Sequence, residues 1–389
     1  FGSAGGKMSI RGFDNTRINQ TFDGIPLNDS GNYALYSNQQ LDSELIEQVN
    51  VNLGSTDVDS PTAAASGSTV NYRTRKPGEE FGVKLVGAAG DFNFFRIFGM
   101  VDTGTFTSFG TRAFFSASMS RNDTVFGNAN MPAYTATPTT AARPAITSRT
   151  GEIEEQQYNA RIYQPVGDNG DYVSVSGHYN ENRNNFFGST GLRNVHNIAS
   201  NFVPNIFPQN KDDRDYGIAR CQTNQAARPG LADTANSCGS TFDERFNPSN
   251  TGNIRINGRF THAEGLILNV EPSFQYVKAN GGGTVVGQEV RRDVNPSGGA
   301  ANCNTTANSA TVSCQTGYIG GTPYFGRDLN GDGDLLDTIR LLAPSQTQTR
   351  RFGLIAGLRY EINDNHTARI FYSFDRARHR QTGEVGGLL

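Results

Sequence analysis

Apolar and polar residues alternate along much of this chain with a period of two residues. In the segment 266–277, one set of alternate positions is apolar: Leu266, Leu268, Val270, Phe274 and Tyr276. The positions between them are polar: Asn269, Glu271, Ser273 and Gln275. A period of two predicts an extended strand with one apolar face and one wet face. The apolar face of such a strand packs against either a protein core or lipid.

Eight other segments after about residue 80 share this alternation. With 266–277, the predicted strands are 81–91, 94–104, 111–121, 156–167, 172–182, 252–262, 350–362 and 367–378. Each has about ten residues or slightly more, which is the length a tilted strand needs to cross a bilayer. In the segment 252–262, Ile254 and Ile256 alternate with Arg255 and Asn257, so one face carries charge.

The connections between these strands are short and long in turn. Tight turns fall at 167–170, 262–265 and 363–366. The long connections are about 122–156, 183–250 and 278–347. Long structureless loops at every second connection are unusual for a soluble sandwich. They are typical of outer-membrane barrels, whose turns are short at one end and long at the other. We therefore expect a transmembrane antiparallel β-barrel with an apolar face toward lipid, a charged lumen and extracellular long loops.

Composition agrees with this interpretation. The hydrophobic fraction is 35%, below the usual 45–50% of globular chains. Lys+Arg numbers 34 against Asp+Glu 37, so the chain has no global basic field that would favour nucleic acid. Because no run of 18 apolar residues occurs, we expect no transmembrane helix. A secreted β-sandwich of the carbohydrate-active kind is the alternative, and it would require the charged face to be exposed to solvent.

The first 78 residues follow a different pattern. Short β segments alternate with turns at 8–13, 18–27, 45–55 and 68–74. Ser43 precedes Glu44 and Glu47, a spacing that predicts a short helical turn with a capping box. This segment therefore predicts a small α+β unit.

Four elements of this unit occur in the order found in the plug domain of TonB-dependent outer-membrane receptors. Ile10-Arg11-Gly12 resembles the IRG element of that family, and residues 23–27 (DGIPL) resemble its DG-(V/I)-P turn. Residues 44–49 resemble the segment before the last plug strands, and residues 66–72 resemble the closing strand. The family's RGP and YG elements are replaced here by residues 52–55 and by the run PTAAASG, which indicates a differently shaped apical loop.

The resemblance implies a domain plan and a function. Residues 1–78 would be the C-terminal part of a plug domain and 79–389 the N-terminal part of the barrel. About nine strands are predicted here, whereas plugged transporter barrels have about 22. The TonB box and the first part of the plug would then precede the chain, and the rest of the barrel would follow Leu389.

A protein of this family would import a scarce nutrient, such as a siderophore, vitamin, oligosaccharide or peptide. It would lie in the bacterial cell outer membrane, in contact with lipid, with TonB and an extracellular small molecule as partners. A passive porin or a surface-binding barrel is the alternative within membrane proteins.

Two groups of site residues follow from the resemblance. The plug loop after the DGIPL turn would rise toward the outside and help to bind substrate. Its candidate residues are Asn28, Asp29, Asn32, Tyr33 and Tyr36. Arg11 would contact a carboxylate on the barrel wall and so hold the plug. The alternatives are an ordinary Asn/Gly/Ser-rich turn and a solvated arginine.

The segment 326–337 (GRDLNGDGDLLD) carries a possible calcium motif. Asp328, Asn330, Asp332 and Asp334 occupy positions one, three, five and seven of an EF-hand-type loop. Ile339 replaces the usual Glu at position twelve, and Asp337 could substitute in another geometry. A structural calcium ion or a solvated acidic turn would explain the pattern, and no cofactor is otherwise expected.

The four cysteines form two local pairs in long polar connections: Cys221 with Cys238, and Cys303 with Cys314. Such pairs are typical of disulfides in an oxidising compartment. Unrelated thiols or a zinc site are the alternatives, although neither pair has metal-ligand spacing. The chain has no GxSxG, HExxH or P-loop motif, so we expect no enzyme.

Overall fold

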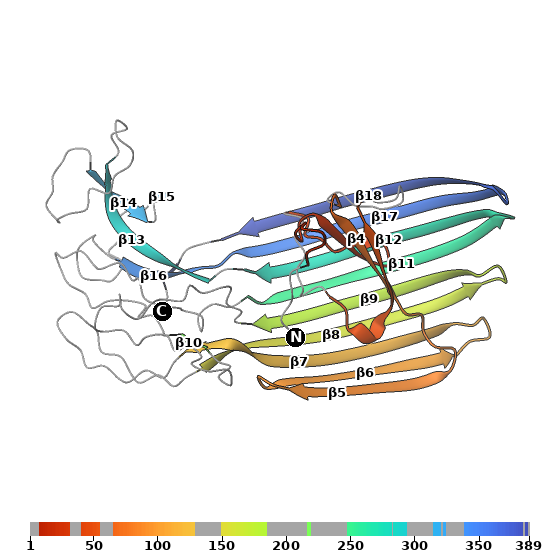
Figure 1. Ribbon diagram of the computed structural model, residues 1–389, viewed down its shortest axis with the longest axis horizontal. Helices are drawn as coiled ribbons and strands as arrows, with labels where there is room; N and C mark the ends of the chain where they lie inside the picture. Colours follow the sequence, from red (N-terminus) through yellow and green to blue (C-terminus); the bar gives the residue numbers. More distant parts are fainter. Residues whose placement is uncertain are drawn as a thin grey trace.

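The computed structural model describes residues 8–31, 40–54, 65–128, 149–184, 216–218, 247–281, 283–293, 314–319, 322–323, 338–383 and 386–387. Its largest sheet contains all nine strands expected from the alternating pattern. They are β5 (Phe81–Gly90), β6 (Phe94–Thr105), β7 (Arg112–Asn128), β8 (Arg149–Val166), β9 (Asp171–Asn184), β11 (Ser249–Ala263), β12 (Leu266–Asn280), β17 (Gln346–Asn363) and β18 (His366–Thr382). Consecutive members of this series pair antiparallel. We call them the wall (Figure 1).

From β6 onward, the short turns of the wall lie at one end and the long connections at the other, as expected, while the short turn 91–93 between β5 and β6 lies at the long-connection end (Figure 1). The tight turns 167–170 and 264–265 and the turn 364–365 join β8 to β9, β11 to β12 and β17 to β18. The strands reach further than predicted at the long-connection end, since β7 continues to Asn128 and β8 starts at Arg149. The connection predicted at 122–156 is therefore shorter than expected.

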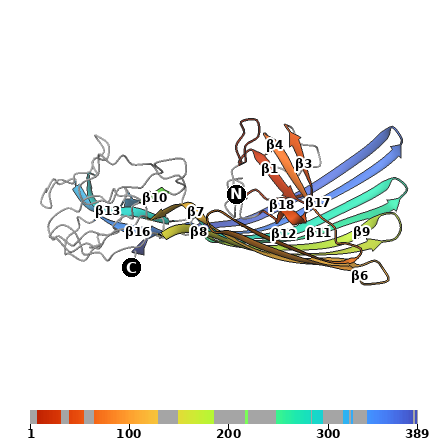
Figure 2. The same cartoon turned by 60° about the horizontal axis from the view of Figure 1, so that its bottom comes forward.

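A second, smaller sheet lies beyond that end (Figures 1 and 2). It consists of β13 (Gly283–Asp293), β14 (Cys314–Ile319), β15 (Thr322–Pro323), β16 (Thr338–Ala343) and β19 (Gly386–Gly387). Most of these strands come from the connection predicted at 278–347, so part of that segment is regular structure. The short β10 (Tyr216–Ile218) pairs parallel with β7.

The two faces of the wall differ as the alternation predicted. Outward-facing Leu85 and Ile370 are 77% and 71% exposed, and many other large apolar side chains on this face are exposed to a smaller degree. Inward-facing polar residues such as Ser174 and Asn180 are fully buried. This distribution is the reverse of that of a soluble protein, and it places the apolar face toward lipid. Within the described part of the chain, no helix is long and apolar enough to cross a membrane.

The N-terminal unit forms a four-stranded sheet, which we call the plug sheet. Its strands are β1 (Ile18–Phe22), β2 (Ile25–Pro26), β3 (Ile46–Leu53) and β4 (Ser68–Thr74), in the order β2-β1-β4-β3. Figure 2 shows this sheet standing against one face of the curved wall. The segment predicted as a strand at 8–13 contains only an isolated bridge between Ile10 and Phe13.

The helical turn predicted at Ser43 is one turn of 3-10 helix, η2 (Ser43–Leu45). The predicted capping box is absent, because Asp42 is the N-cap residue and makes no side-chain capping bond. The Ser43 hydroxyl donates to Glu44 instead. Strand β3 begins directly after Leu45, since pairing with β4 extends the chain.

One apolar core joins the plug sheet to the wall. The plug contributes Phe22, Ile25, Leu27, Leu41 and Leu45. Strands β6 and β7 contribute Phe98, Met100 and Phe114. Burial of these side chains is the main force that holds the plug sheet against this side of the wall.

Candidate functional site

The interface between the plug sheet and the wall is held by ionic and hydrogen-bonded contacts around the apolar core. The first contact is an ion pair between Asp23 of the plug and Arg255 of β11, with 3.1 Å between Oδ2 and Nη2. The Asp23 carboxylate also accepts hydrogen bonds from the backbone N–H of Thr74, at 2.8 Å, and from its hydroxyl, at 2.6 Å. A single carboxylate therefore joins the β1–β2 turn, the end of β4 and the wall.

The turn that presents Asp23 has an unusual backbone. Asp23 and Gly24 both have positive φ, at 43° and 87°. A Cβ atom on Gly24 would lie 2.8 Å from Glu271 Oε2 of β12. Glycine is therefore required here both for the left-handed conformation and for the close approach to the wall.

A second wall arginine binds the end of β4. Arg161 of β8 donates from Nη1 to the Thr74 hydroxyl at 2.8 Å and to the carbonyl oxygens of Thr74 and Arg75 at 3.0 and 3.1 Å. Its Nε donates to the Ser174 hydroxyl of β9 at 2.8 Å, which fixes the guanidinium to the wall. Thr74 consequently bridges Asp23 and Arg161.

A third arginine binds the η2 turn. Arg96 of β6 lies 2.8 Å from Asp42 and 2.7 Å from Glu44. Ser118 of β7 donates to the other Asp42 oxygen at 2.7 Å. Burial raises the pKa of the Asp42 carboxyl, although the bonds from Arg96 and Ser118 act in the opposite direction. The hydrogen bonds from Arg96 lower the pKa of the Glu44 carboxyl, which is less buried.

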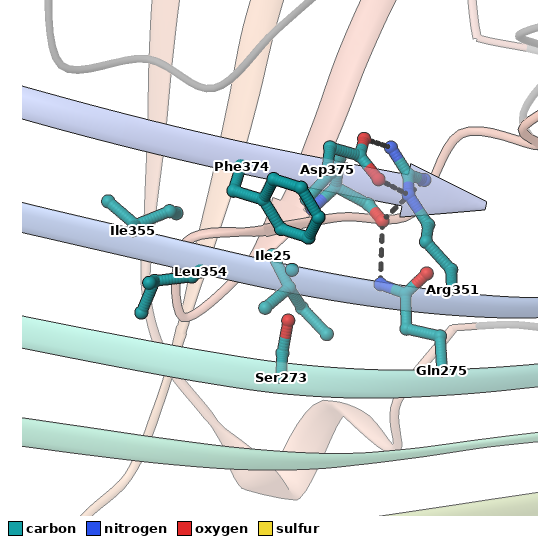
Figure 3. A pocket seen from close by; sticks show the side chains of 10 residues that line it. Ile25, Ser273, Gln275, Arg351, Leu354, Ile355, Phe374 and Asp375 are labelled. Atoms are coloured by element: carbon teal, nitrogen blue, oxygen red, sulfur yellow. Dashed lines mark hydrogen bonds and ion pairs between the residues drawn. The ribbon is translucent and has the colours of Figure 1, made fainter.

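A fourth arginine holds the strand that leads to the apical loop (Figure 3). Arg351 of β17 pairs with Asp375 of β18 through two hydrogen bonds. Its Nη1 donates to the carbonyl oxygens of Pro26 and Asn28, at 3.3 and 2.9 Å. Gln275 of β12 donates to the same Pro26 oxygen at 2.7 Å. Strands β12, β17 and β18 thus all contribute to one clamp on the plug main chain.

The linker from the plug to the wall is also held. Arg75 forms an ion pair of 2.8 Å with Asp102 of β6, which accepts the Gly78 N–H through its other oxygen. The Lys76 ammonium lies 5.2 and 5.3 Å from the ring centroids of Tyr163 and Tyr172, within cation–π range. The domain boundary predicted after residue 78 lies in this linker.

The structure assigns two of the predicted apical residues to contacts inside the plug. Asn28 is 4% exposed. Its amide donates to the Ile18 carbonyl at 2.8 Å and accepts the Gln20 N–H at 2.9 Å, so this side chain supports β1. Asp29 is half-buried and accepts the Gly31 N–H in a local turn, at 2.8 Å. Asn32, Tyr33 and Tyr36 lie outside the described residues, and substrate binding by this loop stays a prediction.

The contact predicted for Arg11 is not found in the described part of the wall, and it stays a prediction. Its side chain is exposed in the turn between Ile10 and Phe13, with φ at 52°. Within the described ranges, no ion pair of Arg11 with the wall is present. In the contacts that the structure describes, the arginines belong to the wall and most of the acceptors belong to the plug. Alternation had placed Arg255 on the charged face, but nothing in the sequence identified its partner.

The predicted calcium ligands Asp328, Asn330, Asp332, Asp334 and Asp337 all lie outside the described residues, as do Cys221, Cys238 and Cys303. Cys314 begins β14, of which only the backbone is described. Among the residues that the structure does describe, no group of three or more metal-ligand side chains is found. Calcium binding and both disulfides therefore stay predictions.

Comparison with known proteins supports the assignment of the two parts. Residues 1–68 match the family model described as the TonB-dependent receptor plug domain. No curated protein sequence gives a significant match. Among solved structures, the chain resembles the ferripyoverdine receptor of the outer membrane of Pseudomonas aeruginosa bound to ferripyoverdine, with 13% identity and a TM-score of 0.53. The match covers 97% of this chain and 37% of that one.

A second similar structure is the pyoverdine outer membrane receptor FpvA from Pseudomonas aeruginosa PAO1 bound to pyoverdine. It has 14% identity and a TM-score of 0.52, and the match covers 97% of this chain and 41% of that chain. At these identities the likeness shows the fold. The chain spans less than half the length of either receptor.

A small sheet docked by wall arginines against an antiparallel wall with an apolar outer face is the architecture of a plugged β-barrel. Residues 1–68 thus match the plug domain of TonB-dependent receptors, and the fold of the chain resembles the plug and part of the barrel of such receptors. The apolar outer face of the wall is that of a barrel embedded in a membrane.

Proposed function

We propose that the complete protein imports a scarce nutrient across the outer membrane by TonB-driven rearrangement of the plug. The extracellular loops and the plug apex bind the ligand, which is a siderophore, vitamin, oligosaccharide or peptide. TonB then pulls on a TonB box, and the docked plug moves to let the ligand pass. The mechanism consists of binding and a change of conformation, without bond chemistry.

One observation supports this proposal most directly. Besides the apolar core at β6 and β7, the plug is joined to the wall by a limited set of polar contacts, centred on Arg96, Arg161, Arg255 and Arg351. Such contacts are directional and are lost over short displacements, whereas the wall is held by continuous strand pairing. A pulling force is therefore expected to displace the plug before it disrupts the barrel.

Ferric chelates are the first ligands to test, since the two similar receptors are described as bound to ferripyoverdine or pyoverdine. The complete gene would be expressed in cells with and without tonB, and radiolabelled ferric siderophores would be offered at limiting concentration. We expect accumulation that requires both the receptor and tonB. Equal accumulation without tonB would instead indicate a passive porin. Surface binding without accumulation would indicate a binding barrel.

A further inference from the structure

A large open cavity separates the plug sheet from part of the wall. Its volume is about 970 Å³. On the plug side it is lined by polar residues of β3 and β4, including Asn50, Asn52, Asn71 and Arg73. On the wall side it is lined by β12, β17 and β18. The apolar core lies on β6 and β7 instead, so only one side of the plug sheet is tightly packed against the wall.

Most of the plug residues that line this cavity are polar. Register between β3 and β4 pairs Asn50 with Asn71 and Asn52 with Thr69. Of the apolar residues of β3, Val51 also lines the cavity, whereas Val49 and Leu53 are not among its lining residues. Apart from Val51, the described residues of β3 and β4 that line the cavity carry amide, phenol or guanidinium groups, and none of them carries a carboxylate. The face is therefore rich in hydrogen-bond donors.

The wall adds two arginines that lie opposite each other. Arg359 of β17 is the register partner of Arg369 of β18, and both line the cavity near the turn 364–365. Like charges on directly opposite residues of paired strands are destabilising. Two carboxylates offset this charge in part: Glu361 lies 2.6 Å from Arg359, and Glu271 lines the cavity at the level of Gly24. With Arg73, three guanidinium groups face two carboxylates, so the net charge of the site is positive.

We propose that this cavity is an exit vestibule that attracts anionic, oxygen-rich solutes as they leave the plug for the periplasm. This inference rests on the proposed transport function. The vestibule lies at the short-turn end of the wall, which is the periplasmic end in barrels of this kind. Carboxylate, phosphate or phenolate oxygens would accept hydrogen bonds from its guanidinium and amide groups. The attraction is greatest where the walls limit access of water, as in a cleft lined by charge of one sign.

The test measures the charge preference of the vestibule without any knowledge of the ligand. Asn52→Cys places a thiol in the cavity of the full-length receptor, purified in detergent. Its reaction rates with a sulfonate-bearing and a trimethylammonium-bearing methanethiosulfonate would be compared. Ser108→Cys, exposed in the turn between β6 and β7 at the same end of the barrel, is the matched control. The receptor without either substitution gives the background of its native cysteines.

We expect the ratio of sulfonate to trimethylammonium rates to be about fivefold higher at position 52 than at position 108, as for charge-steered encounter. Arg359→Gln with Arg369→Gln should remove most of this excess, and high salt should reduce it. Equal ratios at the two positions, or an excess that survives the double substitution, would overturn the proposal. A heat-dependent gel shift checks that each variant is folded. Since these reactions need neither TonB nor uptake, a failure of the transport proposal would be seen separately.

Discussion

Arg255 of the wall and Asp23 of the plug form an ion pair in which both side chains are almost completely buried, at 4% and 9% exposure. The two residues are 232 positions apart in the sequence, and the pair joins the tightest turn of the plug to the middle of β11. Removal of one member leaves an unpaired buried charge, which is more costly than loss of the pair as a whole.

Substitution of one member should therefore loosen the plug. For Arg255→Met, we expect the free energy that keeps β1 and β4 protected from exchange to fall by about 3 kcal/mol. The double variant Asp23→Asn with Arg255→Met should lose less than the sum of the single variants. Hydrogen exchange of β1 and β4 amides, read by mass spectrometry, measures both quantities. Additive losses would show that the two side chains do not interact.

Arg351 should control the position of the strand that leads to the apical loop. Arg351→Ala removes its bonds to the Pro26 and Asn28 carbonyls, and charged hydrogen bonds contribute about 2 kcal/mol. We expect faster exchange in residues 27–31 and weaker ligand binding, with little change in β5 and β6. Arg350→Ala is the control, because this neighbouring side chain is exposed. If both variants behaved alike, the clamp would have no role.

Docking of the η2 turn should depend on pH in two opposite ways. The docked plug raises the Asp42 pKa above its ordinary 3.8, so mild acidification toward that raised value favours the docked state through this group. It lowers the Glu44 pKa below 4.5, so the contribution of Glu44 is present above 4.5 and is lost as the pH falls through the lowered value.

We therefore expect the urea midpoint of plug unfolding to rise slightly on mild acidification and to fall sharply in strong acid. Asp42→Asn should reduce the rise, and Glu44→Gln should reduce the fall. Midpoints measured at a series of pH values provide the check. An identical profile for Asp42→Asn and the unsubstituted protein would contradict the assignment.

We expect the acidic segment 328–337 to bind calcium, because its oxygen-bearing side chains have the spacing of an EF-hand loop. We expect calorimetry of the full receptor to detect one calcium ion per chain that is released by chelator, with protection of this segment from proteolysis. Asp332→Asn should weaken binding at least tenfold, because the loop would lose one of its few charged ligands. If Asp332→Asn did not affect binding, the ion would be bound elsewhere. If no calcium bound at all, the segment would be a solvated acidic turn.

Alternation predicted the wall well because the constraint is local and repeated. Each strand must present one face to lipid and one to the lumen, so Ile254 and Ile256 could be separated from Arg255 and Asn257 without a structure. The same reasoning located all nine strands. Their ends were less predictable, because β7 and β8 continue as a paired ladder beyond the apolar positions, where side-chain pattern no longer restricts them.

The contacts between plug and wall could not be predicted in the same way. The partner of a buried arginine depends on which segments meet in space, and nothing near Asp23 in the sequence indicates β11. The burial of Asn28 could not be predicted either, since a polar residue in an Asn-rich loop is expected at the surface. Its amide instead replaces a backbone partner for β1, a role that the sequence does not distinguish from ligand binding.

Many of the bonds from the wall to the plug end on main-chain oxygens rather than on side chains. The carbonyls of Gln40, Pro26, Asn28, Thr74 and Arg75 all accept from wall residues. A main-chain acceptor survives almost any substitution at its own position. The plug sequence is therefore free to diverge in evolution while its place in the barrel is retained, provided that the wall keeps its donors.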